Sequence, residues 1–433
     1  MHGQEITASV LAGLGWYYLL VFLLNAGAAY YVCRQHKRLD LGALWGALSA
    51  AYLVLAIAYF VGSGSSHPAD SPLRLPDGVK GAIDDAAGPV TYSMGSVVLF
   101  ILFYWFRRFF TNPVVAWGAL NLLLLFLGFS MTDSDFRLIV GKPDNIPIVA
   151  MIFLLGFFTW LGLWKAVDND RRIAEGRPLA EEEGSDKVLV WPDLVYTELI
   201  AMVVVTVVLV AWGIAFKAPL EQPASTLKTP NPSKAPWYFL GLQEMLVYYD
   251  PWMAGVVLPS MIIVGLMAMP YIDFNRQGSG YYTFAQRKFS ILVFSFGFLV
   301  MWVTLILLGT FLRGPNWNFF GPYEPWDIHK LEALNNVNLS EYLWIGFFGR
   351  GLPSFWLVRE LPGILLVLAY LLLVPPLLAV TVFRSFVVKM GFIRYMVLAN
   401  LILFMASLPI KMVLRWTLNL KYIVAIPEFF FNI

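Results

Sequence analysis

The sequence has little charge and few residues that bind metals or form disulfides. Only 13% of its 433 residues are charged, against roughly 25% in an average soluble domain. Cysteine occurs once, at Cys33, which excludes a disulfide framework within the chain. The net charge of +2 is small and the 30 basic residues are spread along the chain, so we expect no nucleic-acid partner.

Histidine is equally scarce, and the four residues lie at a terminus or in predicted loops: His2, His36, His67 and His329. Two axial haem ligands inside a helical bundle therefore cannot come from this chain alone. The sequence also lacks a Cys-x-x-Cys-His motif, a Walker-type glycine loop and a dinucleotide fingerprint. We predict no metal site in this chain and expect any redox centre on a partner.

Long apolar runs are abundant, since 59% of the residues are hydrophobic. Runs that can cross about 30 Å of hydrocarbon predict an all-α, polytopic membrane bundle of about ten transmembrane helices. The predicted spans are residues 10–32, 41–61, 92–106, 114–131, 146–164, 194–216, 251–269, 289–311, 361–383 and 393–409.

The distribution of lysine and arginine predicts the orientation of these spans. Alternate loops are basic for their length, namely residues 33–40, 107–112, 165–191, 271–288 and 384–395. Because basic short loops stay cytoplasmic, both termini should lie on the outer side. No basic n-region or cleavage site precedes the first span, so we expect no removable signal peptide. We predict a multi-pass protein of a bacterial inner (cytoplasmic) membrane.

A polar segment divides the chain into five spans and five. Residues 166–187 contain the acidic run Glu181-Glu182-Glu183 among glycine and proline, as expected of a cytoplasmic linker. We therefore predict an N-terminal membrane module of unknown role at 1–165, and a second module at 188–311. An outer aromatic loop and two further spans follow at 312–433.

A helix is predicted between the sixth and seventh runs, beginning at Pro236, which suits the first turn of a helix. At 3.6 residues per turn, Trp237, Glu244 and Tyr248 lie on one face, with Gln243 beside them. One acid is thus expected among aromatic rings.

Three motifs occur in order near this helix, and their order and spacing carry a resemblance. They are Trp191-Pro192-Asp193-Leu194-Val195-Tyr196, Pro219-Leu220-Glu221-Gln222-Pro223-Ala224 and Ala235-Pro236-Trp237-Tyr238-Phe239. Residues 188–311 resemble the carboxyl-terminal half of cytochrome b, which in split forms is a separate protein called subunit IV. The resemblance implies a cytochrome b C-terminal-like core of three spans.

The resemblance also implies a function and partners. Members of this family belong to quinol:cytochrome c (or plastocyanin-like) oxidoreductase complexes of electron-transport chains. Quinol is oxidised at a shared outer site, and electrons pass to a Rieske iron–sulfur protein and a c-type cytochrome, with proton release and translocation. Haem b is then expected on a cytochrome b N-terminal-like subunit, and this chain is expected to be a non-haem subunit that is not a complete enzyme alone.

The sequence departs from the family at one position. Where the family has Pro-Glu-Trp-Tyr, this chain has Ala235-Pro236-Trp237-Tyr238, so the glutamate assigned to accept a proton from quinol is missing. We predict that Glu244 replaces it as the catalytic acid, because an apolar pocket raises a carboxyl pKa and suits a transient proton acceptor. The alternative is a carboxylate tied to a neighbouring tyrosine or to a partner's arginine.

The predicted quinone-binding residues are Pro236, Trp237, Tyr238, Gln243, Tyr248 and Asp193. The aromatic residues would form the pocket wall, although rings near an interface also serve as plain membrane anchors. Gln243 is able to hydrogen-bond a quinone oxygen. Asp193 matches the family's inner-site aspartate, with helix capping as the alternative.

The outer loop of residues 313–322 is aromatic and rich in glycine and proline. It is predicted to dock the Rieske head or a c-type cytochrome, or alternatively to rest on lipid with its tryptophan at the headgroups.

Two other functions stay open. A haem-free integral quinol dehydrogenase subunit, feeding an outer iron–sulfur or multihaem protein, would share the quinone pocket without a haem b subunit. A transporter should show paired broken helices and polar groups near mid-membrane, which the sequence does not display.

Overall fold

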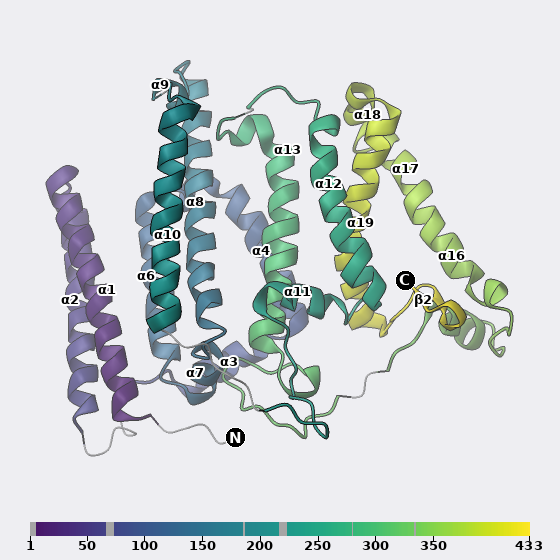
Figure 1. Ribbon diagram of the computed structural model, residues 1–433, viewed down its shortest axis with the longest axis horizontal. Helices are drawn as coiled ribbons and strands as arrows, with labels where there is room; N and C mark the ends of the chain where they lie inside the picture. Colours follow the sequence, from purple (N-terminus) through teal and green to yellow (C-terminus); the bar gives the residue numbers. More distant parts are fainter. Residues whose placement is uncertain (1–5, 66–72, 185–186, 216–222, 279, 333–334) are drawn as a thin grey trace. The chain divides into compact units, whose positions relative to one another are not determined.

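The computed structural model describes residues 6–65, 73–184, 187–215, 223–278, 280–332 and 335–433. Nearly all regular structure in these ranges is helical (Figure 1). Nine of the described helices are long and apolar enough to span a membrane, and α3 and α4 make a tenth if they form one broken span. The prediction of an all-α, multi-pass membrane protein is confirmed. Of the residues singled out above, His2, His67 and residues 219–222 lie outside the described ranges.

The nine candidate spans match nine of the ten predicted runs. They are α1 (Ala8–Gln35), α2 (Leu39–Ser63), α6 (Pro113–Ser130), α8 (Ile146–Ala174), η2 and α10 (Val190–Leu194 and Val195–Ala215), η3 and α12 (Met253–Val257 and Leu258–Ile272), α13 to η5 (Phe284–Ser295, Phe296–Trp302, Val303–Leu307 and Leu308–Leu312), α16 and α17 (Trp356–Leu372 and Val374–Val380) and α19 (Phe392–Leu418). The tenth run corresponds to α4 (Pro89–Trp105), which has 17 residues.

Short elements connect these spans. They are α3 (Asp77–Ala86), α5 (Arg107–Phe110), α7 (Ser134–Val140), α9 (Ala180–Glu183), α11 (Trp237–Met245), η6 (Pro315–Trp317), α15 (Leu339–Glu341), η7 (Tyr342–Phe347), α18 (Arg384–Met390), η8 (Pro427–Phe429) and the strands β1 (Ala425–Ile426) and β2 (Phe431–Asn432). The two strands pair antiparallel. The chain forms two compact units: Met1–Gly88, Ile101–Asn231 and Phe319–Ile328 make the first, and Pro89–Phe100, Pro232–Asn318 and His329–Ile433 the second. The domain boundaries read from the sequence stay a prediction.

The first unit has a core of apolar and aromatic side chains from α1 and α2, which pack side by side (Figure 1). Three polar side chains beside it are bonded to one another. The Asn25 amide donates to the Asn121 side chain at 2.7 Å, and the Trp117 indole donates to Asn25 at 3.0 Å. Because an unpaired polar group is costly in hydrocarbon, this network ties α1 to α6.

The second unit has its core around residues 245–258, 300–305 and 408–412. Its C-terminal segment folds onto the start of η3 and α12. The Asp250 carboxylate accepts hydrogen bonds from the Tyr422 hydroxyl at 3.0 Å and the Asn432 amide at 3.2 Å. The Trp252 ring stacks on Phe431 at 4.9 Å between centroids. These contacts hold the segment that joins α11 to its following span.

Candidate functional site

Helix α11 begins after Pro236, as the sequence predicts. The chain that leads into it is held by a side chain from the far end of the helix. The Gln243 carbonyl oxygen accepts a hydrogen bond from the Ala235 N–H at 2.8 Å, and its amide nitrogen donates to the Ser233 carbonyl at 2.8 Å. Both polar ends of Gln243 are therefore committed to the backbone, which fixes the entry into α11.

The buried face of α11 packs against the C-terminal end of the span from α13 to η5 (Figure 1). Glycine on both sides permits this approach. A Cβ on Gly309 would lie 3.2 Å from the Leu240 carbonyl oxygen, and one on Gly241 would lie 3.3 Å from an Ile306 methylene. The Lys234 ammonium also donates to the Thr310 carbonyl at 2.8 Å. These contacts hold the middle of α11 and the chain before it against η5 and the helix that precedes it.

Glu244 is fully buried, with 0% of its surface exposed, and four side-chain donors surround its carboxylate. Arg313 donates through Nη2 to Oε1 at 2.7 Å and through Nε to Oε2 at 2.9 Å. The Trp317 indole donates to Oε2 at 3.1 Å, and the Tyr248 hydroxyl donates to Oε1 at 3.4 Å. A carboxylate offers about four lone-pair positions. The four hydrogen bonds from side chains of this chain therefore occupy these positions.

Arg313 is itself buried and organises the turn that follows η5. Its third nitrogen, Nη1, donates to the Trp317 carbonyl at 2.6 Å. The turn is closed by the Gly314 N–H, which donates to the Asn318 carbonyl at 3.0 Å. Asn316 and Trp317 both have φ of 57°, a conformation that a bulky side chain rarely adopts. The Arg313 and Glu244 contacts hold Trp317 in this strained conformation.

Burial governs the electrostatics of the cluster. Removing two charges from water is expensive and is offset only by close, hydrogen-bonded geometry, which the two-pronged Glu244–Arg313 contact provides. Burial, and then the adjacent Glu244 carboxylate, raise the pKa of Tyr248 above the ordinary tyrosine value. Tyr248 therefore stays protonated and keeps its role as a donor.

These surroundings differ from the apolar pocket expected of Glu244. The structure matches the alternative weighed above, a carboxylate tied to a tyrosine and an arginine, with the arginine in the same chain. The physical reason is that a fully buried carboxylate far from water requires cationic or polar partners. Tyr248 lies in the turn after α11 ends at Met245, and its hydroxyl contacts Glu244.

The remaining predicted residues of α11 lie at its exposed side. Tyr238 is 51% exposed, as is the adjacent Phe239, while Trp237 is half-buried. The Trp237 and Tyr238 rings meet edge to face at 5.5 Å between centroids, and Tyr238 and Phe239 lie 4.7 Å apart. With the exposed Pro236, they form an aromatic surface, which we call the α11 aromatic face.

Asp193 lies in the other unit, in η2 at the start of α10. Its side chain is exposed, and its carbonyl accepts a hydrogen bond from the Thr197 hydroxyl at 2.9 Å. The first turn of its helix is where a carboxylate is favoured by the helix dipole. Its predicted part in an inner quinone site stays a prediction.

The sequence alone did not identify Arg313 and Trp317 as the partners of Glu244. One signal was available: Arg313 directly follows an apolar span on the same side as Glu244, and a buried acid in such surroundings needs a cation. Within the described part of the chain, no group of three or more histidine, cysteine, aspartate or glutamate residues is placed to hold a metal ion.

Comparison of the sequence with known protein families agrees with this geometry. The family model described as cytochrome b(C-terminal)/b6/petD matches residues 223–320. That range includes α11, the span from α13 to η5 and the turn with Arg313 and Trp317. No curated protein and no solved structure matches the chain. The fold defines a multi-pass helical membrane protein. Residues 223–320 are similar to the cytochrome b C-terminal family, which confirms the resemblance seen in the sequence for that part of the chain.

Proposed function

We propose that this chain is a non-haem subunit of a cytochrome bc-type complex and forms part of its quinol-oxidising site. The match of residues 223–320 to the cytochrome b C-terminal family carries the proposal. A haem-bearing cytochrome b N-terminal-like subunit, a Rieske protein and a c-type cytochrome are the proposed partners. Electrons from quinol pass to the Rieske protein and the c-type cytochrome, and protons are released on the outer side, where the basic-loop pattern puts α11.

The quinol headgroup is proposed to lie on the α11 aromatic face. Trp237 and Tyr238 offer ring surfaces for stacking and a polar edge for a headgroup oxygen, and the exposure of Tyr238 leaves its surface free for a ligand or a partner subunit. Because this face is open in the chain alone, the pocket is completed by another subunit. Gln243 and Tyr248 support the face through their bonds to the backbone and to Glu244.

For Glu244 we propose an anchoring role in place of the proton-accepting role predicted from the sequence. Its oxygens already accept four hydrogen bonds and have no exposed surface. A general base must come within hydrogen-bond reach of the proton that it takes. Glu244 instead fixes Arg313 and Trp317 beneath α11, and so positions the aromatic face.

Photolabelling with an azidoquinone tests the position of the site. In the complex purified through this chain, label in this chain should map to residues 236–239. Tyr238→Ala should raise the KM for quinol about twofold to tenfold, the worth of one aromatic contact. Tyr271→Ala is the matched control, since Tyr271 is 75% exposed and lies at the opposite end of the following span. The α11 aromatic face would be rejected as the quinol site if the label mapped elsewhere in the chain, or if the two variants changed the KM for quinol equally.

The pH profile of quinol oxidation tests the role of Glu244. With Glu244→Gln, an anchoring role predicts a loosened turn but an unchanged pH profile in the complex that still assembles. A proton-accepting role predicts a large fall in kcat and a shifted pH profile, with the turn intact.

A further inference from the structure

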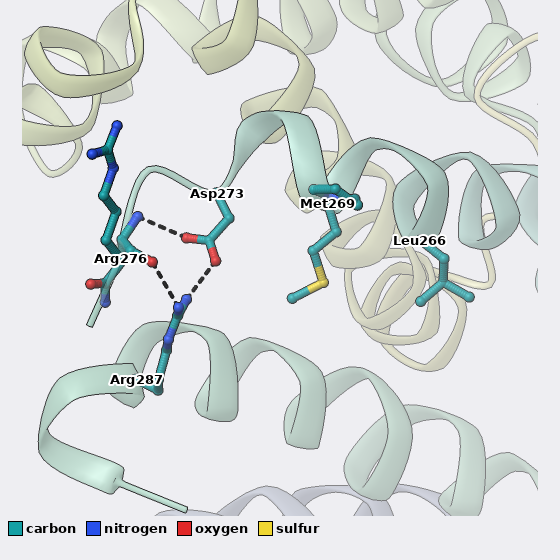
Figure 2. A pocket seen from close by; sticks show the side chains of 7 residues that line it. Leu266, Met269, Asp273, Arg276 and Arg287 are labelled. Carbon is teal, nitrogen blue, oxygen red and sulfur yellow. Dashed lines mark hydrogen bonds and ion pairs between the residues drawn. The ribbon is translucent and has the colours of Figure 1, made fainter. Parts of the chain in front are cut away.

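A second site lies at the other end of α12, where the chain turns into α13. A groove of about 550 Å³, open to the outside, is lined by Leu266, Met269, Pro270, Asp273, Asn275, Arg276 and Arg287 (Figure 2). One end is apolar and belongs to the membrane-spanning part of α12, and the other end is polar and belongs to the loop and to the first turn of α13. The groove is thus amphipathic and lies at the boundary of a span.

The polar end carries a surplus of positive charge. Arg287 is tied to the loop, donating to the Asp273 carboxylate at 2.5 Å and to the Asn275 carbonyl at 2.7 Å. Arg276 extends from the same loop, apart from this pair (Figure 2). Among the described residues it makes no hydrogen bond or ion pair, and it is exposed. The polar end thus contains one carboxylate and two guanidinium groups.

A further positively charged side chain, Lys389, lies beside the loop. The Lys389 ammonium lies 5.6 Å from the centre of the Phe274 ring, and Phe274 packs edge to face on Phe386 of α18 at 5.4 Å. These contacts bring the last turn of α18 against the loop. The charge near the groove is therefore positive, in a loop that the basic-residue pattern predicts to be cytoplasmic.

The apolar end suits an acyl chain. Leu266 is 63% exposed and Met269 is 46% exposed, so both offer side-chain surface that nothing in the described chain covers. A small hydrophilic anion would gain nothing from these side chains. A molecule that carries an anionic head and a hydrocarbon tail would use both ends of the groove.

We propose that this groove binds an anionic phospholipid, with its phosphate at Arg276 and Arg287 and the upper part of one acyl chain along Leu266, Met269 and Pro270. Arg287 is positioned by Asp273, and Arg276 supplies the uncompensated charge. The quinone site and this groove are independent, because no residue is shared between them.

Photocrosslinking in membranes tests this proposal on the full chain. The probes are phosphatidylglycerol and phosphatidylcholine that carry the same diazirine acyl chain, each added to phosphatidylcholine vesicles that contain the protein. Crosslinks to residues 262–273 should be enriched with the phosphatidylglycerol probe. Arg276→Gln should lower that enrichment about fivefold, the effect expected of one arginine at an anionic membrane surface. The variant should fold normally, because Arg276 bonds to nothing in the described chain.

Lys288→Gln is the matched control. It removes the same charge near the start of α13, which follows the loop, but Lys288 is exposed and does not line the groove. It should leave the enrichment unchanged, while Leu266→Gln should lower crosslinking by both probes. Equal crosslinking by the two probes in the wild type, or equal effects of Arg276→Gln and Lys288→Gln, would overturn the proposal. Complete displacement of the probe by inorganic phosphate would identify a free-anion site and would also overturn it.

Discussion

Breaking the Glu244–Arg313 ion pair from either side should open the turn that supports α11. Glu244→Met leaves the Arg313 guanidinium buried without its acid, and Arg313→Met leaves the carboxylate with only the Trp317 and Tyr248 donors. Removing one partner of a buried pair costs about 3–5 kcal/mol. Each single variant should therefore destabilise this region by about that amount.

The double variant should cost much less than the sum of the two single variants. Two methionines remove both charges and fill similar volume, so the uncompensated charge disappears. The Trp317 indole and the Tyr248 hydroxyl still lose an acceptor, at about 1–3 kcal/mol for each buried group left unpaired. The expected double-variant cost is thus close to that of one single variant, with a coupling energy of several kcal/mol.

Hydrogen–deuterium exchange of the turn amides measures these costs locally. The Gly314, Trp317 and Asn318 N–H groups are bonded within the turn, so they exchange only when it opens. Each single variant should speed their exchange more than about a hundredfold, since about 1.4 kcal/mol corresponds to a factor of ten.

The exposed pair Arg38–Asp40 is the control. Its side chains are 55% and 64% exposed and lie 2.6 Å apart, and a surface pair is worth at most about 1 kcal/mol. Arg38→Met should therefore change local exchange less than about fivefold. The buried-pair reasoning would be refuted if Glu244→Met or Arg313→Met changed exchange of the turn amides less than about fivefold. It would also be refuted if the free-energy cost of the double variant equalled the sum of the two single-variant costs.

Three further predictions concern the neighbourhood of α11. Gln243→Leu removes the oxygen that accepts the hydrogen bond of the Ala235 N–H, at a cost of about 1 kcal/mol, and should therefore speed hydrogen exchange of that amide. Unchanged exchange would contradict the role of Gln243 in fixing the entry into α11. Gly309→Val should lower the thermal stability of the purified chain by about 1–3 kcal/mol, because a Cβ there would press on the Leu240 carbonyl; a wild-type melting temperature would contradict this close contact. Burial and a neighbouring guanidinium lower the pKa of Lys421, so the folded state binds its proton less readily than the unfolded state, and stability should rise as the pH approaches the ordinary lysine value of about 10.4. Melting curves of wild type and Lys421→Gln across that range should show the stability of wild type rising relative to that of the variant; a constant difference between the two would contradict the lowered pKa.

The spans and the start of α11 were predictable because their signals are local. Apolar length alone located nine spans, and Pro236 marked the entry into the helix. Helical spacing also predicted that Tyr248 lies near Glu244, and the two side chains are in contact. The remaining predicted span corresponds to α4, which makes a tenth candidate span together with α3, and apolar length does not show a break of this kind.

The partners inside the site were not predictable from spacing. Which cation meets Glu244 depends on how α11 packs against the end of η5, and Arg313 is brought there by tertiary structure. Gln243 was expected to meet a ligand because its amide is polar, yet the nearby backbone N–H and carbonyl groups take both its ends. Long-range packing, which single-sequence patterns do not report, decided the partner of Glu244, whereas Gln243 bonds to the nearby backbone of Ala235 and Ser233.

A reduced-minus-oxidised visible spectrum tests the proposed function most directly. It should be recorded on the complex purified through this chain and, beside it, on the chain expressed alone. Membership of a cytochrome bc-type complex predicts b-type haem absorption in the complex and none in the isolated chain. A quinol-oxidising complex without b haem would contradict that membership and favour a haem-free quinol dehydrogenase, and b haem in the isolated chain would contradict the non-haem role.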